Sequence, residues 1–183
     1  MRIISGKFKG RSLYGPQDTV TRPTSDRVRE SIFNILENSL YLKWEGLHIL
    51  DLYAGTGALG VEALSRGASF CLFVDNHPHA IEIIKKNSAS FSHISIWQND
   101  VSHLKSNPHA PFDVVFLDPP YKKDLISTTI KTLLSSNYIK EGSYIVAELS
   151  NKERINNSAS LEKIKEKIYG KTTITVFRYK KPL

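Results

Sequence analysis

Residues 47–68 read LHILDLYAGTGALGVEALSRGA and contain the clearest strand-to-helix pattern of the chain. The first seven of them are mostly apolar and predict a buried strand, and residues 58–66 predict a helix. Between them GTGALG, residues 55–60, fits the G-x-G-x-x-G pattern. That pattern marks a tight strand-to-helix turn, which can present backbone N–H groups and a helix N-terminus to a ligand. Because the glycine pattern alone is weak evidence, a turn that binds nothing stays an alternative at this point.

The rest of the chain repeats this alternation of strand and helix. Further strands are predicted at 70–75, 94–98, 113–118 and 144–149, and further helices at 78–90 and 123–135. Such alternation predicts an α/β fold whose parallel sheet is covered by helices on both faces. Short hairpin strands at 2–5 and 11–14 and a helix at 25–40 precede it. A closing antiparallel pair, 161–169 with 172–179, follows it, although 161–169 also suits a helix.

The length of 183 residues suits one domain with a single core, so we expect residues 1–183 to fold together. The single cysteine, Cys71, excludes an internal disulfide and a cysteine zinc site, and the histidines lack metal-ligand spacing. The N-terminus has no long apolar stretch of the kind found in signal peptides and membrane anchors. We therefore expect a cytoplasmic protein without a metal, and a monomer.

Positive charge is concentrated at the two ends of the chain. Residues 1–30 hold seven Lys/Arg and three acids, a net of +4, and residues 161–183 hold seven and two, a net of +5. The remaining residues, 31–160, hold eleven and thirteen, a net of −2. This distribution favours a basic surface for a polyanion around a nearly neutral body, although solvated lysines that only keep the protein soluble are an alternative.

Aspartates follow the predicted strands. Four successive strands end in or near an aspartate: Asp51, Asp75, Asp100 and Asp118. One of them would be unremarkable as a helix cap. In parallel α/β sheets, however, ligands bind beyond the carboxyl ends of the strands, and four carboxylates at one such edge predict a binding site there.

The position of Asp51 decides between two cofactors. It lies four residues before Gly55, at the mouth of the glycine loop, where a carboxylate would repel the pyrophosphate of a nicotinamide dinucleotide. It would instead attract S-adenosylmethionine (SAM), which carries an amine and a sulfonium and has no phosphate. Asp75 would accept hydrogen bonds from the ribose of either cofactor. Asp100 would accept from the adenine amino group, while the N–H of Val101 meets a ring nitrogen.

The stretch VVFLDPPYKK, residues 114–123, predicts the chemistry. Two prolines remove two N–H donors, so Asp118-Pro119-Pro120-Tyr121 presents only acceptors beside an aromatic ring. Such a cradle fits a planar base that carries an NH₂ group: Asp118 and the Pro119 carbonyl would accept its two N–H groups. The nitrogen lone pair would then point at the methyl carbon, while Tyr121 stacks on the base. A rigid turn that caps a helix is the structural alternative.

These motifs resemble a known family. DPPY resembles the motif of amino-directed methyltransferases, and RIISGKFKGRSL (2–13), RPTSDRVRESIFNIL (22–36) and DLYAGTGALGVEALSRGA (51–68) resemble the RsmD family of bacterial 16S ribosomal RNA guanine-N2 methyltransferases. The resemblance implies a Rossmann-like class I fold with a seven-stranded, mostly parallel sheet. It divides the chain into an RNA-facing extension, 1–40, and a SAM-binding catalytic core, 41–183. It implies that cofactor contacts fall on Asp51, Ala54, Gly55, Thr56, Gly57, Asp75, Asn76, Asp100 and Val101, and catalysis on Asp118, Pro119, Pro120 and Tyr121.

The arginines around the first helix are the expected RNA contacts, because the guanidinium fork suits phosphate. Arg22 and Arg27 are the main candidates, with Arg11 and Lys7 as general phosphate contacts. Arg29 is a weaker candidate and could be an ordinary solvated helix residue. Pairing of Arg27 with Asp26 is the alternative to an RNA role.

The expected partner is small-subunit ribosomal RNA, free or within a partly assembled 30S particle. A DNA adenine-N6 methyltransferase would share the DPPY chemistry, but the chain has no spare length for a target-recognition region. A dehydrogenase conflicts with Asp51. A non-catalytic RNA-binding module for ribosome assembly predicts that loss of the Asp118 carboxylate leaves the function intact.

Overall fold

The computed structural model describes residues 1–15, 26–119, 125–150, 155 and 160–181. The helices are α1 (Asp26–Asn34), α2 (Ala58–Ser65), α3 (Pro78–Ser88) and α4 (Leu125–Ser135), with a π-helical turn η1 (Ile35–Ser39) and a 3₁₀ turn η2 (Val101–His103). The strands are β1 (His48–Leu52), β2 (Phe70–Asp75), β3 (Ile94–Gln98), β4 (Phe112–Leu117), β5 (Ile139–Ser150), β6 (Leu161–Tyr169) and β7 (Thr172–Tyr179).

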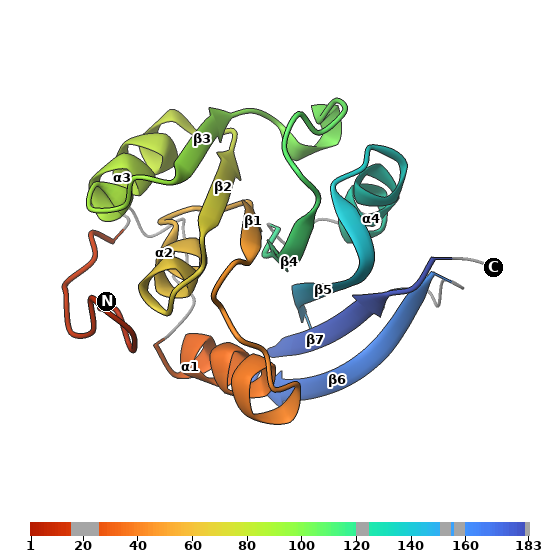
Figure 1. The fold of residues 1–183 in the computed structure, drawn as a ribbon, viewed down its shortest axis with the longest axis horizontal. Coiled ribbons are helices and arrows are strands. Elements are labelled where there is room, and N and C mark those ends of the chain that lie inside the picture. Colours follow the sequence, from red (N-terminus) through yellow and green to blue (C-terminus); the bar gives the residue numbers. More distant parts are fainter. Residues whose placement is uncertain (16–25, 120–124, 151–154, 156–159, 182–183) are drawn as a thin grey trace.

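All seven strands form one sheet in the order β3-β2-β1-β4-β5-β7-β6 (Figure 1). The first five are parallel, while β7 runs antiparallel to both β5 and β6. This confirms the predicted α/β class, the seven-stranded mostly parallel sheet and the closing antiparallel pair. Strand order reverses at β1 and β4, the switch point where α/β sheets bind ligands beyond the strand ends.

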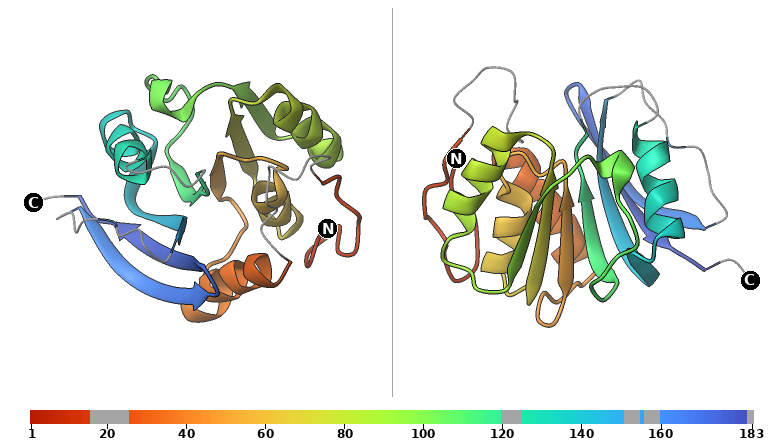
Figure 2. Two further views of the ribbon diagram at one scale, coloured as in Figure 1. Left: turned by 180° about the vertical axis from the view of Figure 1, so that it is seen from behind. Right: turned by 90° about the horizontal axis from the view of Figure 1, so that it is seen from above.

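Helices cover both faces of this sheet, as the alternation predicted (Figure 2). One core cluster contains apolar side chains of α1, α2 and α3, and the other contains those of α4. The near-continuous apolar runs of β1, β2 and β4 follow from this arrangement, because a strand covered on both faces buries every side chain.

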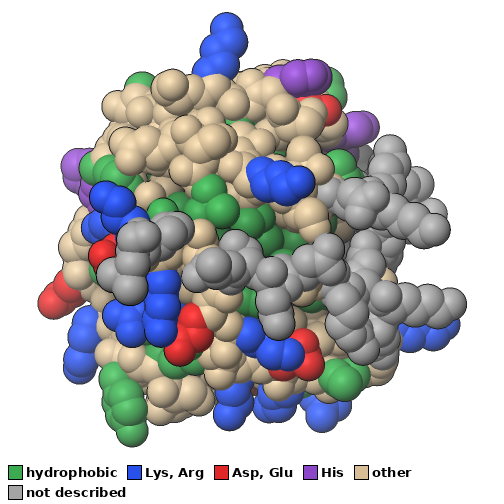
Figure 3. Space-filling model, turned by 90° about the vertical axis from the view of Figure 1, so that its right-hand side faces the viewer, with side chains coloured by type: hydrophobic (Ala, Val, Ile, Leu, Met, Phe, Trp, Pro, Cys, Tyr) green, Lys and Arg blue, Asp and Glu red, His purple; other side chains and the backbone are tan. Residues whose placement is uncertain are grey.

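Strand β6 forms the edge of the sheet and is largely exposed. Charged residues along it blunt an edge that could otherwise pair with another chain. In Figure 3, which faces this side of the molecule, Lys and Arg side chains gather along the lower rim, where β6 lies in Figure 1. Because Thr172 pairs with Ser150, the turn between β6 and β7 lies at the carboxyl edge of β5.

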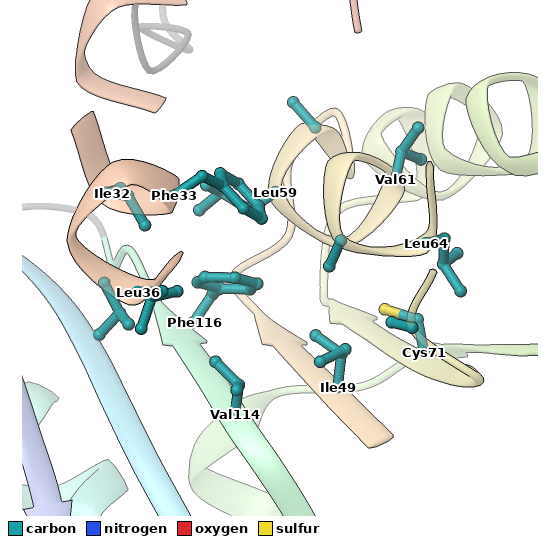
Figure 4. Packing of buried hydrophobic residues seen from close by; sticks show 14 of the residues in the cluster. Ile32, Phe33, Leu36, Ile49, Leu59, Val61, Leu64, Cys71, Val114 and Phe116 are labelled. Atoms are coloured by element: carbon teal, nitrogen blue, oxygen red, sulfur yellow. The ribbon is translucent and has the colours of Figure 1, made fainter. Parts of the chain in front are cut away.

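The N-terminal segment and α1 share a core with the sheet. Ile3, Leu13 and Phe33 are buried in the same cluster as residues of β1 and β4. The rings of Phe33 and Phe116 are 5.7 Å apart (Figure 4). Burying a side chain of that size stabilises a fold by roughly 1.5–3 kcal/mol, so this packing holds the extension against the sheet.

Two predicted elements of the extension differ from the structure. The predicted hairpin at 2–5 and 11–14 is present but short: it has a single antiparallel bridge, Arg2 with Ser12, and the N–H groups of Ile3 and Leu13 donate to the carbonyls of Arg11 and Met1. The segment also takes part of its backbone bonding from α2, since the N–H of Lys7 donates to the carbonyl of Ser65 at 2.7 Å. The helix predicted at 25–40 is regular only to Asn34 and then widens into η1.

Candidate active site

The glycine loop between β1 and α2 depends on backbone shapes that glycine supplies. Gly55 and Gly57 have φ of 55° and 72°, which side-chain-bearing residues rarely adopt. Gly60 is needed for another reason: a Cβ there would lie 2.3 Å from Cε1 of Phe73 on β2. The loop is therefore tight, and the first turn of α2 packs directly on the sheet.

The N–H groups of the three glycines already have acceptors within the protein. Gly55 donates to Oδ2 of Asp75 at 2.8 Å, Gly57 to the carbonyl of Ala54 at 2.7 Å, and Gly60 to Oδ2 of Asp51 at 2.9 Å. A dinucleotide-binding loop directs such donors at pyrophosphate. Here two carboxylates flank the loop and occupy two of them, so the loop fits a cationic, phosphate-free ligand better than a pyrophosphate.

Asp51, on β1 before the glycine loop, is a buried carboxylate with a raised pKa. Its side chain is buried, with 2% of the residue exposed, and it accepts a hydrogen bond from Gly60 N–H. No described residue forms an ion pair with it. Burial raises the pKa of Asp51 to about 7, with a smaller contribution from the negative charge of Asp75. A positively charged group beside it would restore the ionised form, which is what a SAM amine would supply.

The remaining predicted cofactor residues lie at neighbouring strand ends. Asp75 ends β2 and accepts from the N–H groups of both Gly55 and His77. Asp100 follows β3 and caps η2 through Ser102, while Val101 is buried behind it. The Asp75 carbonyl accepts from Asn99 N–H at 3.0 Å, which ties these two strand ends together. Asn76, Ala54 and Thr56 complete the rim, Asn76 exposed and Thr56 buried.

The predicted catalytic segment starts beside the glycine loop. Leu117 pairs with Leu52, so Asp118 and Tyr53 follow adjacent parallel strands at the same edge. Tyr53, at φ 56°, holds its hydroxyl 2.9 Å from Thr129 of α4. Asp118 is partly exposed and Pro119 is buried. The other two residues of the motif, Pro120 and Tyr121, lie outside the described residues.

Sequence reasoning missed a buried ion network on the other side of α2. Glu62 is fully buried and accepts from the N–H groups of Ile4 and Ser5 at 2.7 and 2.9 Å. Its carboxylate also pairs with Arg66 at 2.9 Å and lies 3.9 Å from Nε of Arg29. Glu62 therefore attaches the N-terminal segment and α1 to the helix that follows the glycine loop. The only sequence signal for Glu62 was its position within residues 51–68, which resemble the RsmD family.

Asn87 of α3, also missed, connects the glycine loop to the N-terminal segment. Its amide nitrogen donates to the carbonyls of Thr56 at 2.8 Å and Tyr14 at 3.1 Å, and its oxygen accepts from Tyr14 N–H at 2.8 Å. Asn87 is buried, so these bonds are shielded from water. Tyr14 directly precedes the segment that carries Arg22.

The predicted RNA contacts are dispersed over the surface. Arg27 is exposed on α1, and Arg22 lies outside the described residues. Lys7 and Arg11 are near the last residue of α2 and the end of α3, since Lys7 N–H donates to Ser65 and the Arg11 guanidinium to Ser90. Both helices begin at the carboxyl edge, so these two side chains lie toward the opposite end of the sheet.

The interpretation of Arg29 as a solvated helix residue is wrong. Arg29 is fully buried, pairs with Asp26 at 3.0 Å and donates to the backbone carbonyl of Arg2. Asp26 therefore pairs with Arg29. The alternative prediction, that Asp26 pairs with Arg27, is wrong. Arg29 holds the N-terminal segment in place. Arg27 is exposed, and its RNA role stays a prediction.

Metal clusters and membrane-spanning helices are both absent from the described part of the chain. Among those residues no group of three or more His, Cys, Asp or Glu side chains is arranged to hold a metal ion. No helix described here is both long enough and apolar enough to cross a membrane.

Known proteins resemble this chain over nearly its whole length. The chain matches the family described as "Conserved hypothetical protein 95" over residues 1–178. It is 36% identical to YlbH of Bacillus subtilis, over 97% of this chain and 98% of that protein. It is 34% identical to ribosomal RNA small subunit methyltransferase D of Haemophilus influenzae, over 93% of this chain and 89% of that one. The solved structure of yhhF from Escherichia coli superposes with a TM-score of 0.84 at 29% identity, covering 98% and 97% of the two chains.

Proposed function

Since the chain belongs to the RsmD family, we propose that it transfers a methyl group from SAM to the exocyclic N2 amine of a guanine in small-subunit ribosomal RNA. Relatives named for ribosomal RNA methylation match most of the chain, which supports both the reaction and the substrate class. The Rossmann-like class I methyltransferase fold agrees with it.

One observation carries the choice of cofactor: the carboxylates of Asp51 and Asp75 occupy the glycine-loop N–H groups that a pyrophosphate would need. When bound, SAM supplies an electrophilic methyl group on a positively charged sulfur. Asp51 would hold its amine, Asp75 its ribose and Asp100 its adenine amino group, with Ala54, Gly55, Thr56, Gly57, Asn76 and Val101 around them. The buried, cation-free surroundings of Asp51 within the described structure fit that assignment.

The role proposed for Asp118 is to orient the target amine. The lone pair of an exocyclic amine is delocalised into the base, so the nitrogen is a poor nucleophile until its hydrogens are held. Asp118 and the Pro119 carbonyl would accept the two N–H groups, and Tyr121 would stack on the ring. A hydrogen bond to a charged acceptor contributes about 1.5–3 kcal/mol, and stacking roughly 1–3 kcal/mol. A paired base would first have to be flipped out of its helix.

Arg22 and Arg27, with Lys7 and Arg11 farther away, are the proposed phosphate contacts, and the substrate is ribosomal RNA alone or in an assembling 30S particle. We expect the enzyme to act as a monomer in the cytoplasm, where small subunits are assembled. No metal takes part in the proposed reaction.

The test is methyl transfer by an Asp118→Ala variant to 16S ribosomal RNA from cells that lack the protein. Loss of an oriented acceptor should lower kcat by about 10²–10⁴-fold while SAM binding persists. Mass mapping of the product from the wild-type protein should show one new methylguanine. Glu82→Ala, a carboxylate 67% exposed on α3, is the matched control and should retain wild-type activity.

Full function of Asp118→Ala would instead support a non-catalytic module for ribosome assembly. Methylation of DNA adenine in place of ribosomal RNA would overturn the substrate assignment and leave the cofactor assignment standing.

A further inference from the structure

The C-terminal hairpin carries a set of lysines that the proposed active site does not use. Lys165, Lys167 and Lys171 are exposed, and no described carboxylate forms an ion pair with them. Two other lysines near the hairpin differ: Lys163 pairs with Glu166 at 3.4 Å and Lys180 with Glu162 at 3.0 Å. The first three lysines lie along β6 toward the β6–β7 turn, while two further exposed cations without a described ion pair, Arg178 and Lys181, lie at the open end of the hairpin.

The register of the strands places that turn at the active-site edge. Tyr169 pairs with Thr172, and Thr172 with Ser150, the last residue of β5. β5 is parallel to β4, whose carboxyl end leads into Asp118. The turn, residues 169–172, therefore lies at the edge where the predicted catalytic segment begins, two strands along the sheet (Figure 2).

Helix α1 brings an N-terminal arginine to the same place. The hydroxyl of Ser31 on α1 is hydrogen-bonded to the hydroxyl of Tyr169, which fixes the helix against the end of β6. Arg27 is exposed and precedes Ser31 by four residues, so the two lie on one face of the helix. Arg27 is therefore on the side of α1 that faces the turn.

Lys167 projects on that side of the sheet. It pairs with Ile174, which is buried in the core cluster that α1 shares, and directly opposed side chains in an antiparallel pair lie on the same face. Its ammonium also lies 5.3 Å from the centre of the Tyr169 ring. Lys167 and the helix that carries Arg27, far apart in sequence, thus both contact Tyr169, the helix through Ser31.

We propose that Lys167, Lys171 and Arg27 form a second RNA-contact surface, the turn surface, which binds the phosphate backbone of the ribosomal RNA beside the target nucleotide. This inference rests on the proposed function. Phosphate contacts position a nucleic acid without reading its sequence, and exposed cations without counter-ions are suited to that role. The turn surface would fix the orientation of the RNA while residues 118–121 bind the base.

The test compares two double variants that remove the same charge. Lys167→Gln/Lys171→Gln removes two cations from the turn surface, and Lys163→Gln/Lys180→Gln removes two cations that are paired with glutamates. All four lysines are exposed, so neither variant disturbs the core. The probe is 16S ribosomal RNA from cells lacking the protein, in a binding titration at several salt concentrations and in the methyl-transfer assay.

For the turn-surface variant we expect RNA affinity on the order of tenfold weaker at physiological salt and a correspondingly higher KM for RNA. The slope of log affinity against log salt should fall by roughly 0.7–0.9 for each RNA phosphate that the variant no longer neutralises. Lys167→Arg/Lys171→Arg should restore affinity, because it restores the charge. SAM affinity should stay at the wild-type value in every variant.

Equal RNA affinity and salt slope in the two Gln variants would overturn the turn surface while the methylation proposal stands. RNA that binds with the expected lysine dependence but is never methylated would overturn the proposed function and support the turn surface. Lysine-dependent binding to anionic phosphatidylglycerol vesicles, with RNA affinity unchanged, would assign the surface to a membrane and overturn the inference.

Discussion

Asp51 on β1 and Glu62 on α2 are buried carboxylates on either side of the glycine loop in the chain, and their surroundings are opposite. Glu62 accepts two backbone N–H groups, pairs with Arg66 and lies near Arg29. Asp51 accepts from Gly60 N–H, and no described cation pairs with it. The charge of Glu62 is thus balanced within the protein, whereas that of Asp51 is not.

The charge of Glu62 supports the fold, whereas that of Asp51 is available for function. An ionised group in the interior is stable only when it is paired and hydrogen-bonded. Glu62 meets that condition without any ligand, through partners within the folded chain. Asp51 would meet it only when a cation binds, and a raised pKa combined with a position beside a ligand loop is typical of functional sites.

The largest expected effect is on stability, from Glu62→Gln. The change leaves the buried Arg29 and Arg66 without their shared carboxylate, and breaking a buried pair in this way costs about 3–5 kcal/mol. Urea unfolding of both proteins would measure it. A decrease of less than about 1 kcal/mol in the free energy of unfolding would show that Glu62 does not stabilise the fold as proposed.

Asp51→Asn should weaken SAM binding, whereas Glu62→Gln should lower stability. The amide keeps an oxygen for Gly60 N–H but loses the charge that would hold the SAM amine. A charge-assisted hydrogen bond of about 1.5–3 kcal/mol corresponds to a roughly tenfold to more than hundredfold weaker SAM affinity. Isothermal titration would measure this, and wild-type affinity in the variant would remove Asp51 from the cofactor site.

The same variant should be more stable than the wild type at alkaline pH without ligand. The folded-state pKa of Asp51, about 7, is above its ordinary value of 3.8, so between those values the folded protein binds more protons than the unfolded chain. The contribution of Asp51 to the free energy of unfolding therefore declines as the pH rises from about 4 to about 7. Above that range the buried, ionised Asp51 destabilises the fold by a few kcal/mol, at roughly 1.4 kcal/mol per unit of pKa difference. Thermal unfolding at about pH 5 and about pH 8 should show the gain at the higher pH.

SAM affinity of the wild-type protein should fall about tenfold for each pH unit below 7, because Asp51 must lose its proton to pair with a cation. Titrations at about pH 5.5, 6.5 and 8 would measure the slope. Asp51→Asn provides the control, since its affinity should be nearly flat over this range. An equally steep slope in the variant would place the titrating group elsewhere.

The smallest effect is expected from Asn87→Ala, which removes the link between the glycine loop and Tyr14. Buried groups left without partners cost about 1–3 kcal/mol each, and we expect a several-fold loss of SAM affinity with faster hydrogen exchange at the Tyr14 amide. Asn107→Ala, which breaks bonds to Ala110 and Asn137 in another loop, is the control. If both variants bind SAM equally well, Asn87 is only structural.

Local pattern was sufficient for the elements of the sheet. The strands at 70–75 and 94–98 and the start of the helix at residue 78 were predicted to the residue, because apolar runs, Pro78 and flanking glycines are short-range signals. The bounds of the N-terminal hairpin strands were not predicted correctly, since the hairpin backbone is bonded partly to Glu62 and Ser65, about sixty residues away. Arg29 was misjudged for the same reason: its burial depends on partners from two other segments.

The order of strands and helices, the glycine loop, the aspartates that follow the strands and the acceptor-rich DPPY segment could all be read from the sequence, because each depends on neighbours within a few residues. Three properties depended on the folded structure: which buried carboxylate is neutralised, which N–H groups of the loop already have acceptors, and that α1 is bonded through Ser31 to the end of β6. Those properties depend on distances between segments far apart in the chain, and burial and pairing of charge are set by such distances.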